Sequence, residues 1–226
     1  HTLFPYTTLF RSELKKIVPF LIDHNVYIIT DEVYEHLIYD NNKPVSVASL
    51  GEKVKNMAIT VNSVSKTYAM TGWRVGYAAG PKEIIRAMGN LQGHASGNVN
   101  SIAQKATIEA LNGDQSSVKE MVSAYTKRRE YMVKRLNKIS GLSCQYPDGA
   151  FYTFPNVEGL YGKTYDHNQI NDDMDVAKFF LTKAHVAVVP GVAFNFPGHI
   201  RFVFAKSMAE IEEGINRIEK AIINLE

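Results

Sequence analysis

The sequence has little of several features that mark particular classes of protein. It contains a single cysteine, Cys144, so no internal disulfide can form, which fits a reducing compartment. No apolar run approaches the roughly 20 residues that a membrane-spanning helix needs. The first residues lack the basic start and long apolar centre of a secretory signal. These absences favour a cytoplasmic protein with no membrane partner.

Charge of neither sign predominates. The chain has 25 basic and 23 acidic residues, a net charge of +2, with both signs interspersed. This balance lacks the one-sided basic surface of a nucleic-acid-binding protein, so no nucleic-acid partner is expected. His94, His185 and His199 show no spacing typical of metal ligands, and no metal site is expected either.

What is present indicates a globular protein. Hydrophobic residues make up 45% of the 226 positions and charged residues 21%, and this length suits one large or two small domains. Residues 1–11 follow neither helical nor strand periodicity and are expected to be a non-native or disordered leader. From Ser12 on, apolar residues recur at helical spacing, although Pro19 interrupts the run.

Three short apolar runs, 26–30, 57–61 and 75–79, predict strands, and a helical pattern follows at 82–91. The first run is expected to be a buried strand that ends at Asp31, and the second leads to Lys66. Strands alternating with helices predict an α/β layered sheet. Ligands in such sheets collect beyond the carboxyl ends of strands, where Asp31 and Lys66 are expected. Residues 89–97 are rich in glycine and are expected to form a loop.

The second half of the chain predicts a smaller α/β unit. A long helix is expected at 116–138, further helices at 173–184 and from Met208, and strands at 150–154, 186–189 and 200–204. Residues 156–172 are expected to be a loop. The predicted organisation is a leader at 1–11, the remainder of a large domain at 12–115, and an interdomain helix with a small domain at 116–226.

The segment SVSKTYAMTGWRVGY, residues 63–77, is the most informative for chemistry. Its polar residues interrupt an otherwise apolar stretch. Lys66 in such a pocket is a candidate nucleophile, because a neutral amine attacks carbonyl carbons. The alternative, from spacing alone, is a solvated surface lysine.

This segment resembles the lysine segment of class I aminotransferases, the aspartate aminotransferase-like members of the fold-type I pyridoxal-phosphate family. Three other segments resemble the family in the same order: DEVY at 31–34, PDGAFY at 147–152, and VVPG with GHIR at 188–201. The resemblance covers residues 12–226. It implies the α/β pyridoxal-phosphate-dependent transferase fold, with a truncated large domain and a small C-terminal domain.

The resemblance also implies a cofactor, pyridoxal 5'-phosphate, held by five residues. Lys66 would carry it as a Schiff base and move the substrate proton. Asp31 would pair with the pyridinium nitrogen, Tyr34 would donate to the phenolic oxygen, and Ser63 and Arg74 would hold the phosphate. The alternatives from the residues alone are a helix-capping Asp31 and a core tyrosine at position 34.

Arg201 would bind the α-carboxylate of an amino acid or 2-oxo acid substrate, the two substrates of a transaminase. Its alternative is an ordinary arginine on a surface strand. The resemblance leaves open a lyase of the same fold, a cofactor-binding sensor domain, and a catalytically inert fragment.

The chain departs from the family because a long amino-terminal half is missing. That half would supply further cofactor contacts and much of the central sheet. We therefore expect a truncated or chimeric reading of a longer gene, with exposed sheet edges that favour aggregation. The full-length parent is expected to be a homodimer, as family members usually are.

Overall fold

The computed structural model describes residues 11–40 and 42–226. The leader expected at residues 1–11 therefore lies outside the described residues up to residue 10, and residue 11 begins helix α1 (Arg11–Asp23). The described chain divides into two compact units, of which one ends at Glu120 and the other begins at Met121. The division falls inside the long helix α5 (Ser116–Leu136).

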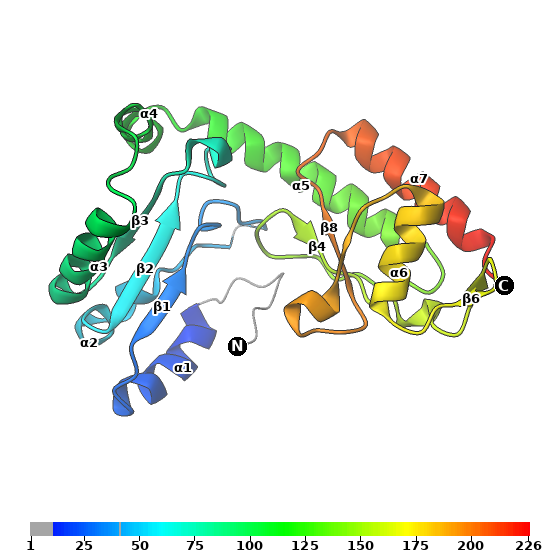
Figure 1. Ribbon diagram of the computed structural model, residues 1–226, viewed down its shortest axis with the longest axis horizontal. Coiled ribbons are helices and arrows are strands. Elements are labelled where there is room, and N and C mark those ends of the chain that lie inside the picture. The colour runs from blue at the N-terminus through cyan, green and yellow to red at the C-terminus, as the bar shows by residue number, and fades with distance from the viewer. Residues whose placement is uncertain (1–10, 41) are drawn as a thin grey trace. The chain divides into compact units, whose positions relative to one another are not determined.

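The first unit contains a three-stranded sheet in the order β1 (Ile28–Asp31), β2 (Ala58–Ser63) and β3 (Gly76–Ala79) (Figure 1). β1 runs parallel to β2, whereas β3 runs antiparallel to it. All three predicted strands are confirmed, with shifted boundaries. Because β3 is antiparallel, its first residues and the last residues of β2 lie at the same edge of the sheet.

Helices and short 3-10 turns fill the rest of this unit. They are α1, η1 (Val47–Leu50), α2 (Glu52–Lys55), η2 (Thr71–Trp73), α3 (Lys82–Ala95) and α4 (Ser101–Asn112). The loop predicted at 89–97 is wrong, because α3 continues to Ala95. Its glycines lower helix propensity without forbidding a helix, and a side chain at Gly89 or Gly93 would meet no atom within 4 Å.

Two features of this unit differ from the sequence prediction. Helix α4 was not predicted, although Asn100 caps it by accepting hydrogen bonds from the backbones of Ile102 and Ala103. The first strand is also not buried as expected, since the side chain of Ile29 is 74% exposed. The physical reason is that successive side chains of β1 point to opposite faces, and among the described residues only the face of Ile28 packs against a core.

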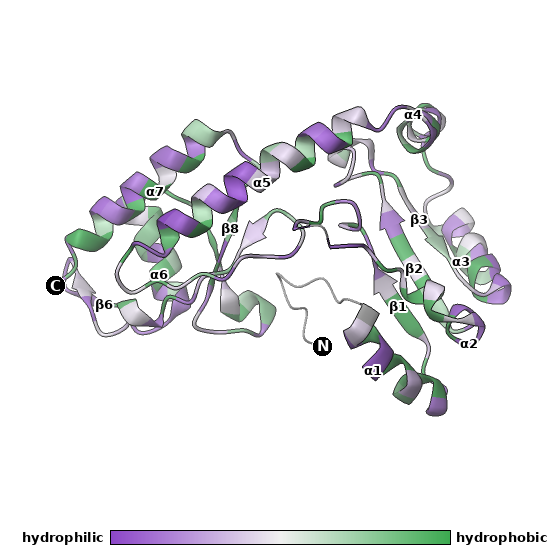
Figure 2. Cartoon of the chain, turned by 180° about the vertical axis from the view of Figure 1, so that it is seen from behind, coloured by the Kyte–Doolittle hydropathy of each residue, from purple (hydrophilic) through white to green (hydrophobic). Residues whose placement is uncertain are grey.

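The second unit is built on a three-stranded antiparallel sheet in the order β4-β8-β7. Its strands and helices are β4 (Tyr152–Thr153), β7 (Val189–Pro190), β8 (Ile200–Val203), α6 (Asp173–Phe179), the π-helical turn η4 (Phe180–Ala184), the 3-10 turns η3 (Glu158–Leu160) and η5 (Gly191–Phe194), and α7 (Met208–Ile223). Hydrophilic and hydrophobic residues alternate along α7 (Figure 2), whose four buried isoleucines form its inner face. The predicted helix from Met208 is confirmed.

The segment 156–172, predicted as a loop, contains a small hairpin. Its strands are β5 (Thr164–Tyr165) and β6 (Asn168–Gln169). Asp166 and His167 join them with φ angles of 44° and 63°, the left-handed conformation that two-residue hairpin turns require. The sequence signal was weak because neither turn residue is glycine. No helix in the described part of the chain is long and apolar enough to cross a membrane.

Candidate active site

The parallel pairing of β1 and β2 brings two predicted site segments to one edge of the sheet. Asp31, the last residue of β1, lies opposite Val61, and the backbone N–H of Glu32 donates to the Val61 carbonyl at 2.9 Å. Strand β2 then ends at Ser63. The side chain of Asp31 is exposed, and its Oδ1 accepts a hydrogen bond from the Val33 backbone at 3.2 Å. Asp31 therefore lies at the carboxyl end of β1, as the last residue of the strand and not just past it.

The antiparallel strand β3 brings Arg74 to the same edge. Ser63 pairs with Gly76, so Arg74 lies just before the start of β3. Arg74 adopts a left-handed conformation with φ 57°, and its Nη1 donates to the Thr71 carbonyl at 3.0 Å. Its side chain is exposed, and it bonds within its own turn in this structure.

The lysine turn, residues 63–67, packs against a small apolar core. Val64 is fully buried in a small core with Val75 and Ala103, and Thr67 is 3% exposed. Lys66 lies between Val64 and Thr67 and is half-buried. The hydroxyl of Ser63 accepts a hydrogen bond from the Ser65 backbone at 3.2 Å, which tightens the turn. Ser63, Ser65 and Lys66 remain partly exposed between the buried residues Asn62, Val64 and Thr67.

Tyr34 lies in the turn that follows β1 and is half-buried. The next residue, Glu35, accepts a hydrogen bond at Oε1 from Asn62 Nδ2 at 2.5 Å. His36 Nε2 lies 3.8 Å from the same carboxylate oxygen. The Glu35–Asn62 bond ties the turn that carries Tyr34 to the strand that carries Ser63. Sequence reasoning missed Glu35 and Asn62, because no motif spacing connects them.

Two tyrosines near this carboxylate have shifted pKa values. Burial raises the pKa of Tyr68, and the negative charge of Glu35 raises it further. Burial likewise raises the pKa of Tyr77, with smaller contributions from Glu35 and Tyr68. The Tyr68 hydroxyl donates to Gln115 Oε1 at 3.1 Å. Both phenols are therefore neutral donors at pH 7.

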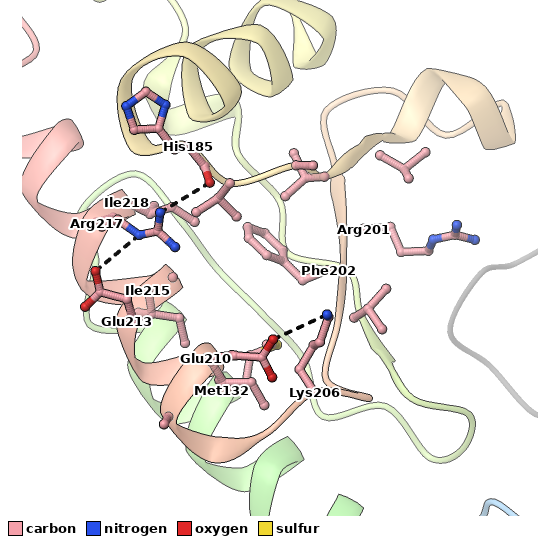
Figure 3. Close-up of a pocket in the computed structure, with 18 residues that line it drawn as sticks. Met132, His185, Arg201, Phe202, Lys206, Glu210, Glu213, Ile215, Arg217 and Ile218 are labelled. Carbon is pink, nitrogen blue, oxygen red and sulfur yellow. Dashed lines mark hydrogen bonds and ion pairs between the residues drawn. The ribbon is translucent and has the colours of Figure 1, made fainter. Parts of the chain in front are cut away.

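Arg201 lies in the second unit, on β8, opposite Val189 of β7. Its guanidinium carbon lies 4.6 Å from the centre of the Tyr152 ring and 4.4 Å from the centre of the Phe194 ring. Its Nε is buried, and no hydrogen-bond partner for it is found among the described residues. Figure 3 shows the Arg201 side chain leaving β8 on the side opposite to Phe202, which points toward α7.

One edge of the first unit therefore gathers an acidic residue, a serine, a lysine and an arginine: Asp31, Ser63, Lys66 and Arg74. The amine is a possible nucleophile, and the hydroxyl and guanidinium are donors suited to an anion. Arg201, in the other unit, presents a fork of donors held between two aromatic faces. Such a fork can bind a carboxylate with two parallel hydrogen bonds.

Comparison with known proteins identifies similar chains. Residues 7–218 match the family model described as aminotransferase class I and II. An aspartate aminotransferase of Rhizobium meliloti (strain 1021) is 43% identical over 212 residues, covering 93% of this chain and 52% of that protein. A probable aspartate/prephenate aminotransferase of Aquifex aeolicus (strain VF5) is 42% identical, covering 94% and 53%. The chain spans about half the length of the curated relatives it matches.

Solved structures show the same likeness. The crystal structure of the aspartate aminotransferase from Rhizobium meliloti matches with a TM-score of 0.94 at 41% identity, over 97% of this chain and 56% of that one. An aromatic aminotransferase from Pyrococcus horikoshii OT3 matches with a TM-score of 0.87 at 36% identity, over 96% and 56%. The predicted fold class, the α/β fold of these enzymes, is confirmed.

Proposed function

Because this chain belongs to the class I and II aminotransferase family, we propose that it carries the lysine-bearing part of a pyridoxal-phosphate-dependent aminotransferase. The reaction moves an amino group between an amino acid, aspartate or a related acid, and a 2-oxo acid. The observation that carries this proposal is the meeting of Asp31, Ser63 and Lys66 at one sheet edge, which follows from the parallel register of β1 and β2.

The donor set at this edge fits the proposed cofactor. Lys66 offers the amine that attaches it, and Asp31 offers a carboxylate for the pyridinium nitrogen. Tyr34 would donate to the phenolic oxygen. Ser63 and Arg74 would hold the phosphate, for which the Arg74 side chain would have to leave the Thr71 carbonyl. When bound, pyridoxal phosphate supplies the electron sink that makes the α-proton of an amino acid removable.

The protein residues would then position the substrate and move its proton. The amine of Lys66 would take the proton from the α-carbon of the substrate and hold it for delivery during amino transfer. In the other unit, Arg201 would bind the α-carboxylate through two parallel hydrogen bonds from its guanidinium.

The relatives of this chain also support a proposal for the whole protein. We propose a cytoplasmic homodimer in which the amino-terminal half of the relatives completes the site. The support is the family membership, together with the match to only 52% of the Rhizobium meliloti enzyme.

The proposal is tested by absorption spectroscopy of the purified chain with added pyridoxal phosphate. Borohydride should fix the cofactor covalently to Lys66, which peptide mapping would locate, and Lys66→Ala should abolish the specific absorption band. Lys82→Ala, an exposed lysine on α3, is the matched control and should keep the band.

Product analysis with L-aspartate then separates transamination, which yields the 2-oxo acid, from lyase chemistry. No specific band, or an equal band in Lys66→Ala, would contradict the proposal for this chain.

A further inference from the structure

The aromatic rings around Arg201 are placed by two different parts of the second unit. Tyr152 lies on β4, where it pairs with Val203, so it shares a sheet face with Arg201, two residues earlier on β8. Phe194 lies instead at the end of the turn η5. Sheet hydrogen bonds position the Tyr152 ring, whereas the position of the Phe194 ring depends on the contacts that hold η5.

A buried carboxylate holds η5 in place. Asp173, the first residue of α6, is 2% exposed, and its Oδ2 accepts a hydrogen bond from the Val192 backbone at 2.7 Å. Val192 is the second residue of η5 and lies 19 residues further along the chain. Burying a carboxylate costs free energy unless it is hydrogen-bonded, so the bond from the Val192 N–H offsets part of the cost of burying Asp173.

Backbone hydrogen bonds hold the rest of the turn. Gly191 N–H donates to the His199 carbonyl at 2.7 Å, and Phe196 N–H donates to the Gly191 carbonyl at 3.0 Å. Asn195 closes the turn in a left-handed conformation with φ 54°. Phe194 is thereby presented to the guanidinium of Arg201 at 4.4 Å.

We propose that Asp173 is a positioning residue for Arg201: by anchoring the Val192 N–H, it holds the Phe194 ring against the guanidinium and so orients the carboxylate-binding fork. The proposal rests on the proposed role of Arg201 for its functional consequence, but not for its structural content. A guanidinium stacked on a ring keeps its N–H donors in a plane parallel to the ring, free to meet a carboxylate edge-on.

The neighbouring residue provides a matched control. Asp172 caps α6 through a hydrogen bond from the Asp175 backbone at 2.9 Å, and no hydrogen bond joins its side chain to η5 among the described residues. Asp172→Ala and Asp173→Ala both remove a carboxylate from the start of α6, but only the second removes the side-chain hydrogen bond to η5. Asp173→Asn keeps an oxygen that can accept the Val192 N–H.

The test is the NMR signal of the Arg201 Nε–Hε group in the full 15N-labelled chain, assigned by its loss in Arg201→Lys. In the native chain the two rings should shift this proton signal upfield. Asp173→Ala should lose most of the contribution from Phe194, as Phe194→Leu does. Asp172→Ala should leave the signal unchanged, and Asp173→Asn should keep most of the shift. An unchanged signal in Asp173→Ala, or equal loss in Asp173→Asn, would overturn the proposal.

Titration with 2-oxoglutarate separates this proposal from the proposed function. If Arg201 binds carboxylates, Asp173→Ala should weaken the response of its signal to 2-oxoglutarate roughly fivefold, the equivalent of one lost hydrogen bond. A native Arg201 signal that does not respond to 2-oxoglutarate would count against the substrate role of Arg201 in this chain. The ring-induced shift would still decide the role of Asp173.

Discussion

The carboxylate of Glu35 accepts a hydrogen bond from the side-chain amide of Asn62 at 2.5 Å, although the two residues are 27 positions apart. Glu35 directly follows Tyr34, and Asn62 directly precedes Ser63. The bond therefore fixes the distance between two segments proposed to contact opposite ends of the same cofactor. Asn62 is 7% exposed, so its amide is largely shielded from competing water.

Asn62→Ala should lower the free energy of unfolding by about 1–3 kcal/mol, because it leaves the Glu35 carboxylate without this donor. Glu35→Gln, which keeps an acceptor, should cost less. Urea unfolding followed by circular dichroism measures both. If cofactor binding is established, Asn62→Ala should also weaken it. Equal stability of Asn62→Ala and the native chain would show that the bond contributes nothing.

Two glycine substitutions should have opposite effects on stability. A Cβ at Gly191 would lie 2.1 Å from the Phe196 carbonyl oxygen and 2.9 Å from that of His199, so Gly191→Ala should displace the backbone of η5 and destabilise the second unit. Gly89 lies in α3 with open space around it, and Gly89→Ala should stabilise by about 1 kcal/mol. Thermal unfolding of the two variants checks the signs, and a stable Gly191→Ala would contradict the described turn.

Alkaline pH should destabilise the chain partly through Tyr161. Burial, and then the charges of Asp173, Glu158 and Asp172, raise the pKa of Tyr161 to about 12. In the unfolded chain a tyrosine has a pKa of about 10. Since the folded pKa is raised, the stabilisation is complete below about pH 10 and is lost as the pH rises toward 12. Tyr161→Phe should therefore show a shallower fall of unfolding free energy across this window. If the unfolding free energies of Tyr161→Phe and of the native chain fall equally with pH, Tyr161 does not contribute to the alkaline destabilisation.

The exposed edge strand should promote self-association. Ile29 on β1 is 74% exposed, and no described strand pairs with the outer edge of β1. Ile29→Lys should reduce light scattering of concentrated samples with little change in unfolding free energy. Its neighbour Ile28 packs against the core around Val54 and Ala58, so Ile28→Lys should unfold the first unit. Scattering unaffected by Ile29→Lys would place the association surface elsewhere.

The strands and the lysine turn were predictable because their signals are local. The apolar runs that precede Asp31 and Ser63 contain β-branched residues, which favour strands. The helix from Met208 was predictable for the same reason, with isoleucines on one face. The loop predicted at 89–97 was wrong because glycine content indicates only weakened helix propensity, which neighbouring turns can override.

By itself the sequence determined which residues carry chemical groups, in what order, and which family the chain resembles, because these depend on residue type and short spacing. Only the tertiary structure decided that β3 runs antiparallel and so returns Arg74 to the edge that holds Ser63. It alone also joined Glu35 to Asn62, and Asp173 to the turn that carries Phe194. The physical reason is that hydrogen bonds between distant residues depend on strand direction and register, which no short stretch of sequence encodes.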